Sequence, residues 1–112
     1  MRALAELLPT GAVQREDAAA WVAFGAAAST RPWLADPYWE ALQIMRTWVE
    51  GILTDARKAG RMRVDLSPAE GARLVTAVVN GLTLDLLNAP PTESDEVIGQ
   101  LRSGLGLILR GL

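Results

Sequence analysis

The stretch VDLSPAEGARLVTAVVNGLTLDLL, residues 64–87, decides the fold of this chain because two structures compete for it. The pair Asn80-Gly81 lies between two apolar runs. This dipeptide is a strong local signal for a β-hairpin, because both residues tolerate the positive φ of a type I′ turn. The alternative is one long helix that continues through the pair.

The beginning of the stretch favours the helix. Ser67 can act as an N-cap, Pro68 fits the first helical position, and Glu70 stands where the acid of a capping box belongs. The apolar residues that follow share one broad arc at helical spacing: Leu74, Val75, Val78, Val79, Leu82 and Leu86. A two-stranded ribbon is marginal in water, and no other segment alternates with the period of a strand. We therefore predict a helix over 67–88, in which Gly81 costs about 1 kcal/mol.

The segments before this helix also have the helical period. The opening MRALAELLP has the composition of the end of a helix, which Pro9 breaks. An Ala-rich segment from about 11 to 29 follows. The next helix is predicted over about 36–59, with Asp36 as its cap, a proline in its first turn, and Gly60 after its last turn.

The end of the chain predicts a last helix after Pro90-Pro91. Thr92 is its predicted cap, and its first turn holds acidic residues, which suit the positive end of the helix dipole. We therefore predict an all-α fold for residues 1–112, an antiparallel helical bundle of four to five helices with short connections.

The composition excludes several classes of protein. The chain has 112 residues, of which 50% are hydrophobic, so one packed core is feasible. It contains no Cys and no His, which argues against thiolate or imidazole metal sites and against cysteine nucleophiles. The net charge is −2, with no basic block for nucleic acid. We expect no secretion signal and no membrane-spanning segment, and we therefore expect a cytoplasmic protein without a cofactor.

Two apolar surfaces exceed what one core needs. The arc on 67–88 is wide, and the last helix also carries apolar residues outside its main stripe. Self-association of these two helices across a two-fold axis would cover them, so we expect a homodimer. The alternative is a monomer with a partly apolar surface.

The aromatic residues and one acid raise further questions. Trp21, Phe24, Tyr38, Trp39, Met45 and Trp48 can form either a plain core or the wall of an apolar pocket. Asp85 lies on the apolar side of its helix near the helix end. It can be a pocket acid, an interface partner for an arginine such as Arg102, or an exposed residue, and the exposed position is the simplest interpretation.

Several stretches resemble the C-terminal ligand-binding and dimerisation domain of TetR-type transcriptional regulators, in particular the BetI-like group. They are LLPT at 7–10, AWVAFGAAA at 20–28, ARKAGRMRVDLSP at 56–68 and EGARLVTAVVNGLTLDLL at 70–87. The family often has Asp-Gly-Leu where this chain has Asn80-Gly81-Leu82.

The resemblance implies a small-molecule effector, a dimer through the last two helices, and DNA binding only through an N-terminal helix-turn-helix domain that is absent from this chain. On this interpretation the effector is apolar or amphipathic. The expected pocket residues are Trp21, Phe24, Met45, Trp48 and Asn80. The expected interface residues are Val75, Val78, Leu82, Leu101, Leu105 and Ile108.

Two competing functions remain open from the sequence. One is a helical dimerisation or protein-interaction domain that binds no ligand. The other is an enzyme, which has little support because Glu40, Glu50 and Asp55 lie on the polar face of their helix. We therefore expect no catalytic residues and no metal site.

Overall fold

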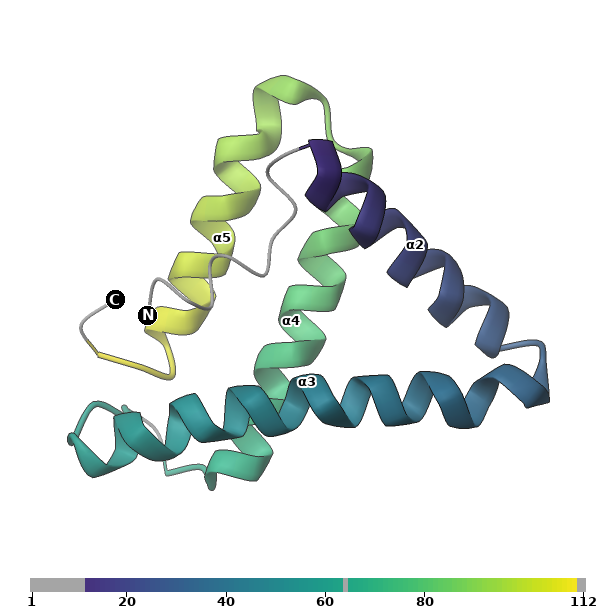
Figure 1. Cartoon of the computed structure of the whole chain (residues 1–112). Helices are drawn as coiled ribbons and strands as arrows, with labels where there is room; N and C mark the ends of the chain where they lie inside the picture. Colours follow the sequence, from purple (N-terminus) through teal and green to yellow (C-terminus); the bar gives the residue numbers. More distant parts are fainter. Residues whose placement is uncertain (1–11, 64, 111–112) are drawn as a thin grey trace.

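The computed structural model describes residues 12–63 and 65–110, and the chain is helical through most of them. The helices are α2 (Ala12–Ala28), α3 (Pro32–Lys58), α4 (Pro68–Asn88), the short 3-10 helix η1 (Pro91–Glu93) and α5 (Ser94–Gly106) (Figure 1). Within these ranges the only extended pairing is an isolated antiparallel bridge between Met62 and Leu109. The all-α prediction is confirmed. The predicted opening segment lies outside the described residues.

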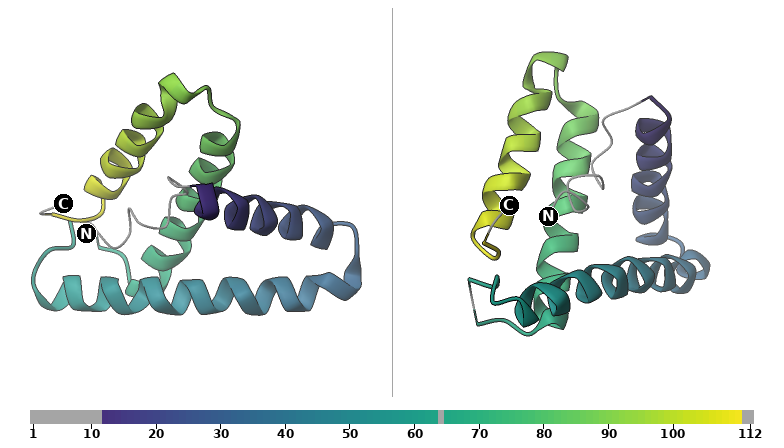
Figure 2. Two further views of the ribbon diagram at one scale, coloured as in Figure 1. Left: turned by 45° about the horizontal axis from the view of Figure 1, so that its top comes forward. Right: turned by 60° about the vertical axis from the view of Figure 1, so that its left-hand side comes forward.

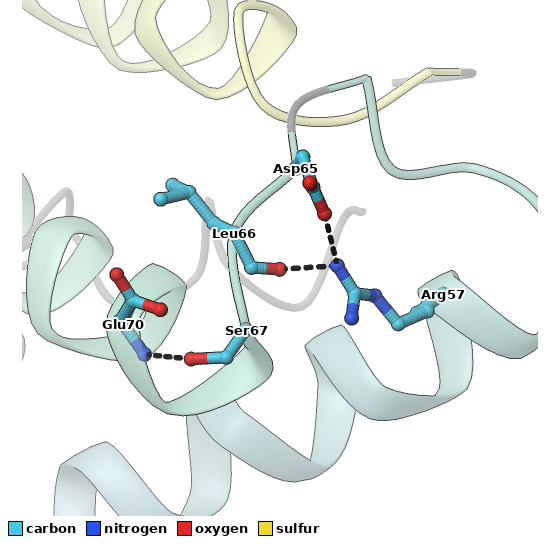
Figure 3. A network of polar contacts seen from close by, with 5 residues as sticks. All are labelled: Arg57, Asp65, Leu66, Ser67 and Glu70. Carbon is cyan, nitrogen blue, oxygen red and sulfur yellow. Dashed lines mark hydrogen bonds and ion pairs between the residues drawn. The ribbon is translucent and has the colours of Figure 1, made fainter.

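The stretch that decided the fold is one helix. α4 continues through Asn80-Gly81 without a turn, and within the described residues Gly60 is the one residue with positive φ. The Ser67 hydroxyl accepts a hydrogen bond from the backbone N–H of Glu70 at 3.1 Å, as an N-cap does. Figure 3 shows this cap beside the last turn of α3.

The connection from α3 to α4 is held at both ends by hydrogen bonds. Gly60, with φ 71°, follows the last turn of α3, and the N–H groups of Gly60 and Arg61 bond back to the carbonyls of Arg57 and Ala56. This pattern is a Schellman motif, which glycine favours because it has no Cβ. The Arg57 guanidinium then donates to the Leu66 carbonyl and lies 3.7 Å from Asp65 (Figure 3).

α3 begins four residues earlier than predicted, at Pro32 instead of Asp36, and Pro37 lies inside the helix. The predicted Asp36 cap is therefore wrong. A proline within a helix leaves the carbonyl four residues before it without its donor, which here is Trp33. Trp33 and Pro37 are both exposed, so water can satisfy that carbonyl and the helix continues.

The last helix also begins differently from the prediction. Thr92 lies inside η1 and does not cap α5, because the backbone N–H of Glu93 bonds to the Pro90 carbonyl and forms a 3-10 turn first. Asp95 and Glu96 occupy the first turn of α5 as expected. The neighbouring Glu96 raises the pKa of Glu93 through a hydrogen bond and through like-charge repulsion.

α5 ends at Gly106, and the residues after it pair with the α3–α4 connection. The Arg63 N–H donates to the Ile108 carbonyl, and the Arg110 N–H donates to the Arg61 carbonyl, each at 2.7 Å. The Arg63 side chain adds a bond from Nε to the Leu109 carbonyl at 3.2 Å. This pairing, which we call the clasp (residues 61–63 with 108–110), ties the end of α5 to the end of α3.

α4 is the central helix of the fold. α3 crosses it near its start, α5 runs antiparallel beside it, and α2 packs against both α3 and α4 (Figures 1 and 2). The core is apolar and draws on three helices and the clasp: Val49, Leu53 and Ala56 of α3; Ala72, Val75, Val79 and Leu86 of α4; Val97, Leu101 and Leu105 of α5; and Ile108 and Leu109. Burying one such side chain stabilises the fold by roughly 1.5–3 kcal/mol for the larger residues.

The crossing of α3 and α4 requires Gly71. A Cβ built on Gly71 would lie 2.7 Å from Cδ1 of Leu53, which is fully buried. Gly71→Ala should therefore lower the free energy of unfolding by about 1–3 kcal/mol, because the buried Leu53 side chain must shift to admit the new Cβ. Urea unfolding followed by far-UV circular dichroism measures the change.

Gly51→Ala is the matched control for this prediction. Gly51 is exposed and also lies inside a helix, but a Cβ there meets nothing within 4 Å. Alanine should stabilise that position by roughly 0.5–1 kcal/mol through helix propensity. Equal stability of the two variants would contradict a close crossing at Gly71.

Candidate functional site: a cleft between α2, α3 and α4

A cleft of about 290 Å³ lies where α2 faces α4 and the first turns of α3. α2 and the residue after it supply most of the lining, and α3 and α4 supply the remainder. The lining residues are Trp21, Val22, Gly25, Ala26 and Ser29; Tyr38; and Asn80 and Leu84. The volume is at the lower end of the range for small-molecule sites.

One wall of the cleft is aromatic. The Trp21 ring stacks on Tyr38, with ring centroids 4.9 Å apart, and Phe24 contacts both rings edge-on. Gly25 permits this contact, because a Cβ at that position would lie 3.1 Å from Cε2 of Tyr38. The wall therefore joins α2 to α3 through ring contacts that a side chain larger than hydrogen would push apart.

The polar groups that the described residues bring to the cleft are few and uncharged. The indole Nε1 of Trp21 donates a hydrogen bond to Oδ1 of Asn80 at 3.3 Å, which links α2 to α4. The Ser29 hydroxyl donates to the Gly25 carbonyl at 3.0 Å. Within the described part of the chain, neither the amide N–H₂ of Asn80 nor the hydroxyl of Tyr38 has a hydrogen-bond partner, so both can bind a ligand. None of the described residues that line the cleft carries a carboxylate or a basic side chain, so this lining suits an uncharged molecule with a planar or apolar body.

Three of the five predicted pocket residues come together here. Trp21 and Asn80 line the cleft, and Phe24 supports its aromatic wall. Met45 and Trp48 do not line it. Trp48 has 47% of its surface exposed, on the side of α3 away from the core. Met45 and Trp48 lie outside the cleft because α3 diverges from α2 after the first turns of α3. Tyr38, in those first turns, therefore lines the cleft, and the later residues of α3 do not.

Sequence reasoning did not assign Tyr38, Gly25 or the small residues of α2 to the site. The signal was present in part, because Tyr38 belongs to the predicted aromatic cluster and Gly25 shares the helical spacing of Trp21 and Phe24. Which members of the cluster meet depends on the angle between α2 and α3, and that angle is a property of the fold.

Asp85 is exposed, which is the simplest of the three interpretations of its position made from the sequence. Its side chain is exposed and does not line the cleft. Arg102 is also exposed, and among the described residues the ion pair is between Arg57 and Asp65. Among the described residues, Asp85 therefore contributes neither to the lining of the cleft nor to an ion pair.

The six residues predicted for the dimer interface lie in or against the core of the subunit itself. Val75, Leu101, Leu105 and Ile108 are buried, and Val78 and Leu82 pack against the same core. α4 packs against both α3 and α5, and its buried apolar residues belong to the core that the three helices share. Four of the six are therefore buried within the subunit itself.

A different apolar stripe of α4 is exposed. Leu74, Ala77, Gly81 and Leu84 follow one another at helical spacing, and Leu74 and Leu84 expose 45% and 48% of their surface. Leu84 also lines the cleft, so the stripe borders it at that end. We call these four residues the α4 stripe. Its two small residues in the middle allow a neighbouring helix to approach closely.

Two other classes of site were also sought. Within 12–63 and 65–110, no three Asp or Glu side chains gather in a way that could hold a metal ion. None of the helices in those ranges is long and apolar enough to cross a membrane.

The comparison with known families agrees with this architecture. The model of the C-terminal domain of BetI-type transcriptional repressors, of the TetR class, matches residues 1–110, which include all the helices described above. No curated protein and no solved structure matches the chain. The chain therefore belongs to the family of BetI-type transcriptional repressor C-terminal domains.

Proposed function

We propose that this chain is the effector-sensing and dimerisation domain of a TetR-type transcriptional regulator, and that its effector is a small, uncharged, apolar or amphipathic molecule. The observation that carries the proposal is the cleft with its aromatic wall and uncharged lining. Such a site offers stacking and apolar contact together with a few hydrogen bonds, which is the usual chemistry of a small-molecule pocket.

The hydrogen bond between Trp21 and Asn80 can couple ligand binding to the relative position of α2 and α4. It joins α2 to α4 at the cleft. A ligand that forms a hydrogen bond with Trp21 or Asn80 in place of this bond changes the contact between α2 and α4. Such a ligand shifts the conformational equilibrium only if it binds one arrangement of the two helices more tightly than the other. In a regulator of this class the DNA-binding domain precedes α2 along the chain, so a shift of α2 would reach it.

The effector proposal can be tested with a variant that has one tryptophan. Trp33, Trp39 and Trp48 are 74%, 54% and 47% exposed, so replacing all three with Phe should preserve the fold and leave Trp21 as the reporter. Titration with a panel of uncharged hydrophobic compounds should give a saturable change of Trp21 fluorescence for at least one compound. A flat signal across the panel would contradict the cleft as an effector site.

A pair of substitutions on α2 locates the binding. Ala26 lines the cleft, whereas Ala23 is exposed on α2 and does not. Ala26→Leu should fill the cleft and weaken binding of the active compound by about tenfold or more, which corresponds to roughly 1.4 kcal/mol. Ala23→Leu should leave the affinity unchanged. Equal losses in both variants would place the binding site elsewhere.

We propose that the homodimer forms through the exposed surface of α4 and α5, with the α4 stripe at its centre. A Cβ on Gly81 meets nothing within 4 Å in the subunit, so Gly81→Leu should not disturb its core. It should, however, obstruct close approach of a partner helix. Sedimentation at micromolar concentration should show a dimer for the native chain and a monomer for Gly81→Leu, whose circular dichroism should be unchanged.

The control for the dimer test is Ala23→Leu, because Ala23 is exposed on α2, outside the α4 stripe. This variant should remain a dimer. A native chain that is monomeric at micromolar concentration, or a Gly81→Leu variant that is still dimeric, would contradict the proposed interface.

The alternative function is a helical dimerisation domain that binds no ligand. It would be favoured by a flat titration together with an intact dimer. For the regulator we propose a cytoplasmic location, where its DNA is, with no cofactor and no catalytic activity. DNA binding is assigned to the N-terminal domain outside this chain.

A further inference from the structure

The side-chain amide of Asn80 has a fixed orientation in the cleft. Its oxygen Oδ1 accepts the hydrogen bond from Nε1 of Trp21 at 3.3 Å. An indole nitrogen can only donate, so an amide turned end for end would place two donors against each other and lose this bond. Trp21 therefore determines which end of the Asn80 amide is engaged with α2 and which end stays free.

The free end of this amide is a hydrogen-bond donor. Nδ2 of Asn80 has no hydrogen-bond partner in the described part of the chain. It is also not buried, because within residues 12–63 and 65–110 the buried side-chain nitrogen or oxygen without a partner is Nε of Arg46. Asn80 itself is half-buried and lines the cleft. The cleft therefore presents an accessible N–H₂ group, which can bind an acceptor and cannot bind a donor.

The hydroxyl groups at the cleft are more adaptable than this amide. The Ser29 hydroxyl donates to the Gly25 carbonyl and can still accept a hydrogen bond, and the Tyr38 hydroxyl can donate or accept. A hydroxyl hydrogen rotates to suit its partner, whereas the Asn80 amide cannot turn without losing its bond to Trp21. Asn80 is therefore the lining residue that requires one kind of partner.

We propose that the effector of this cleft is an uncharged ring compound with a carbonyl oxygen, and that Asn80 selects it by donating a hydrogen bond from Nδ2. This inference rests on the proposed effector function, to which it adds the chemical class of the ligand and the residue that recognises it. The ring packs against the aromatic wall of Trp21 and Tyr38, and the small residues Gly25 and Ala26 leave room for it.

The charge of the lining favours a carbonyl over an ionised carboxylate. A carboxylate oxygen would also accept a bond from Nδ2. However, burying a charged group is costly unless it is paired, and none of the described lining residues carries a positive charge. An uncharged carbonyl oxygen accepts the same bond without this cost.

A ligand of this kind favours one arrangement of α2 and α4. Its hydrogen bond to Nδ2 uses the amide orientation that the bond from Trp21 maintains. Hydrogen bonds in a chain polarise one another, so the two bonds of the Asn80 amide strengthen each other. The ligand therefore binds more tightly to the arrangement in which α2 and α4 are joined by this bond.

The test compares two uncharged probes of the same shape. Acetophenone has a carbonyl oxygen, and α-methylstyrene has a CH₂ group in its place. Titration of the 112-residue chain followed by saturation-transfer NMR measures the dissociation constant of each probe. Acetophenone should bind about three- to tenfold more tightly, which is the net effect of one hydrogen bond between uncharged groups. Ala26→Leu, which fills the cleft, should weaken the binding of both probes.

Replacing the donor with an acceptor identifies the residue that selects the ligand. Asn80→Asp keeps an oxygen for Nε1 of Trp21 and replaces the N–H₂ group with a second oxygen. The preference for acetophenone should disappear in this variant, because two acceptors then face each other. The matched control is Asn88→Asp, since Asn88 is exposed on the same helix and does not line the cleft. The control should retain the native preference.

The inference would be overturned by no binding of acetophenone, by equal binding of both probes to the native chain, or by an unchanged preference in Asn80→Asp. A preference that is lost in Tyr38→Phe and kept in Asn80→Asp would assign the selection to the tyrosine hydroxyl and would also contradict it. Equal binding of two probes that Ala26→Leu weakens would still support the cleft as an effector site. The inference can therefore fail while the proposed function stands, whereas a flat titration across the whole panel of hydrophobic compounds would contradict the proposed function.

Discussion

The structure depends on the close crossing of α3 and α4 at Gly71. The absence of a side chain there lets Leu53 of α3 lie directly against the backbone of α4. Leu53, Val49 and Val75 are fully buried at this contact, and the core extends from it along α4. Interiors are close-packed, so one additional methyl group at the crossing would displace the buried Leu53 side chain.

The crossing also determines where the rest of α3 lies. α3 begins well beyond α4. α2, which precedes α3 in the chain, lies between that end of α3 and α4 and packs against both helices (Figure 1). The three helices thereby outline the cleft, with Trp21 and Tyr38 in contact at one side and Asn80 at the other. On the opposite side of the molecule the clasp between 61–63 and 108–110 holds α5 in place. The candidate site is therefore a consequence of helix geometry and not of a sequence motif.

The predictions made from the sequence succeeded where local chemistry decides the structure. Ser67, Pro68 and Glu70 signal the start of α4, and Gly60 signals the end of α3, because caps depend on a few neighbouring residues. They failed at Pro37 and Thr92, where two possible helix starts lie close together in the sequence. α3 begins at Pro32 because its first turn is exposed to solvent, and α5 begins at Ser94 because a 3-10 turn precedes it. Neither the exposure nor the 3-10 turn can be deduced from the local sequence pattern alone.

The sequence by itself determined that this chain is helical, where most of its helices lie, and which of their residues are apolar, since periodicity and capping act within a few turns. Its resemblance to a family of regulators likewise came from those patterns. Only the tertiary structure decided which apolar residues face the core, the cleft or solvent. Val75 and Leu105 lie in the core, Trp21 and Tyr38 form the aromatic wall of the cleft, and Trp48 is largely exposed to solvent. The physical reason is that a helical stripe specifies a direction around its own axis, whereas the neighbour in that direction depends on how the helices cross.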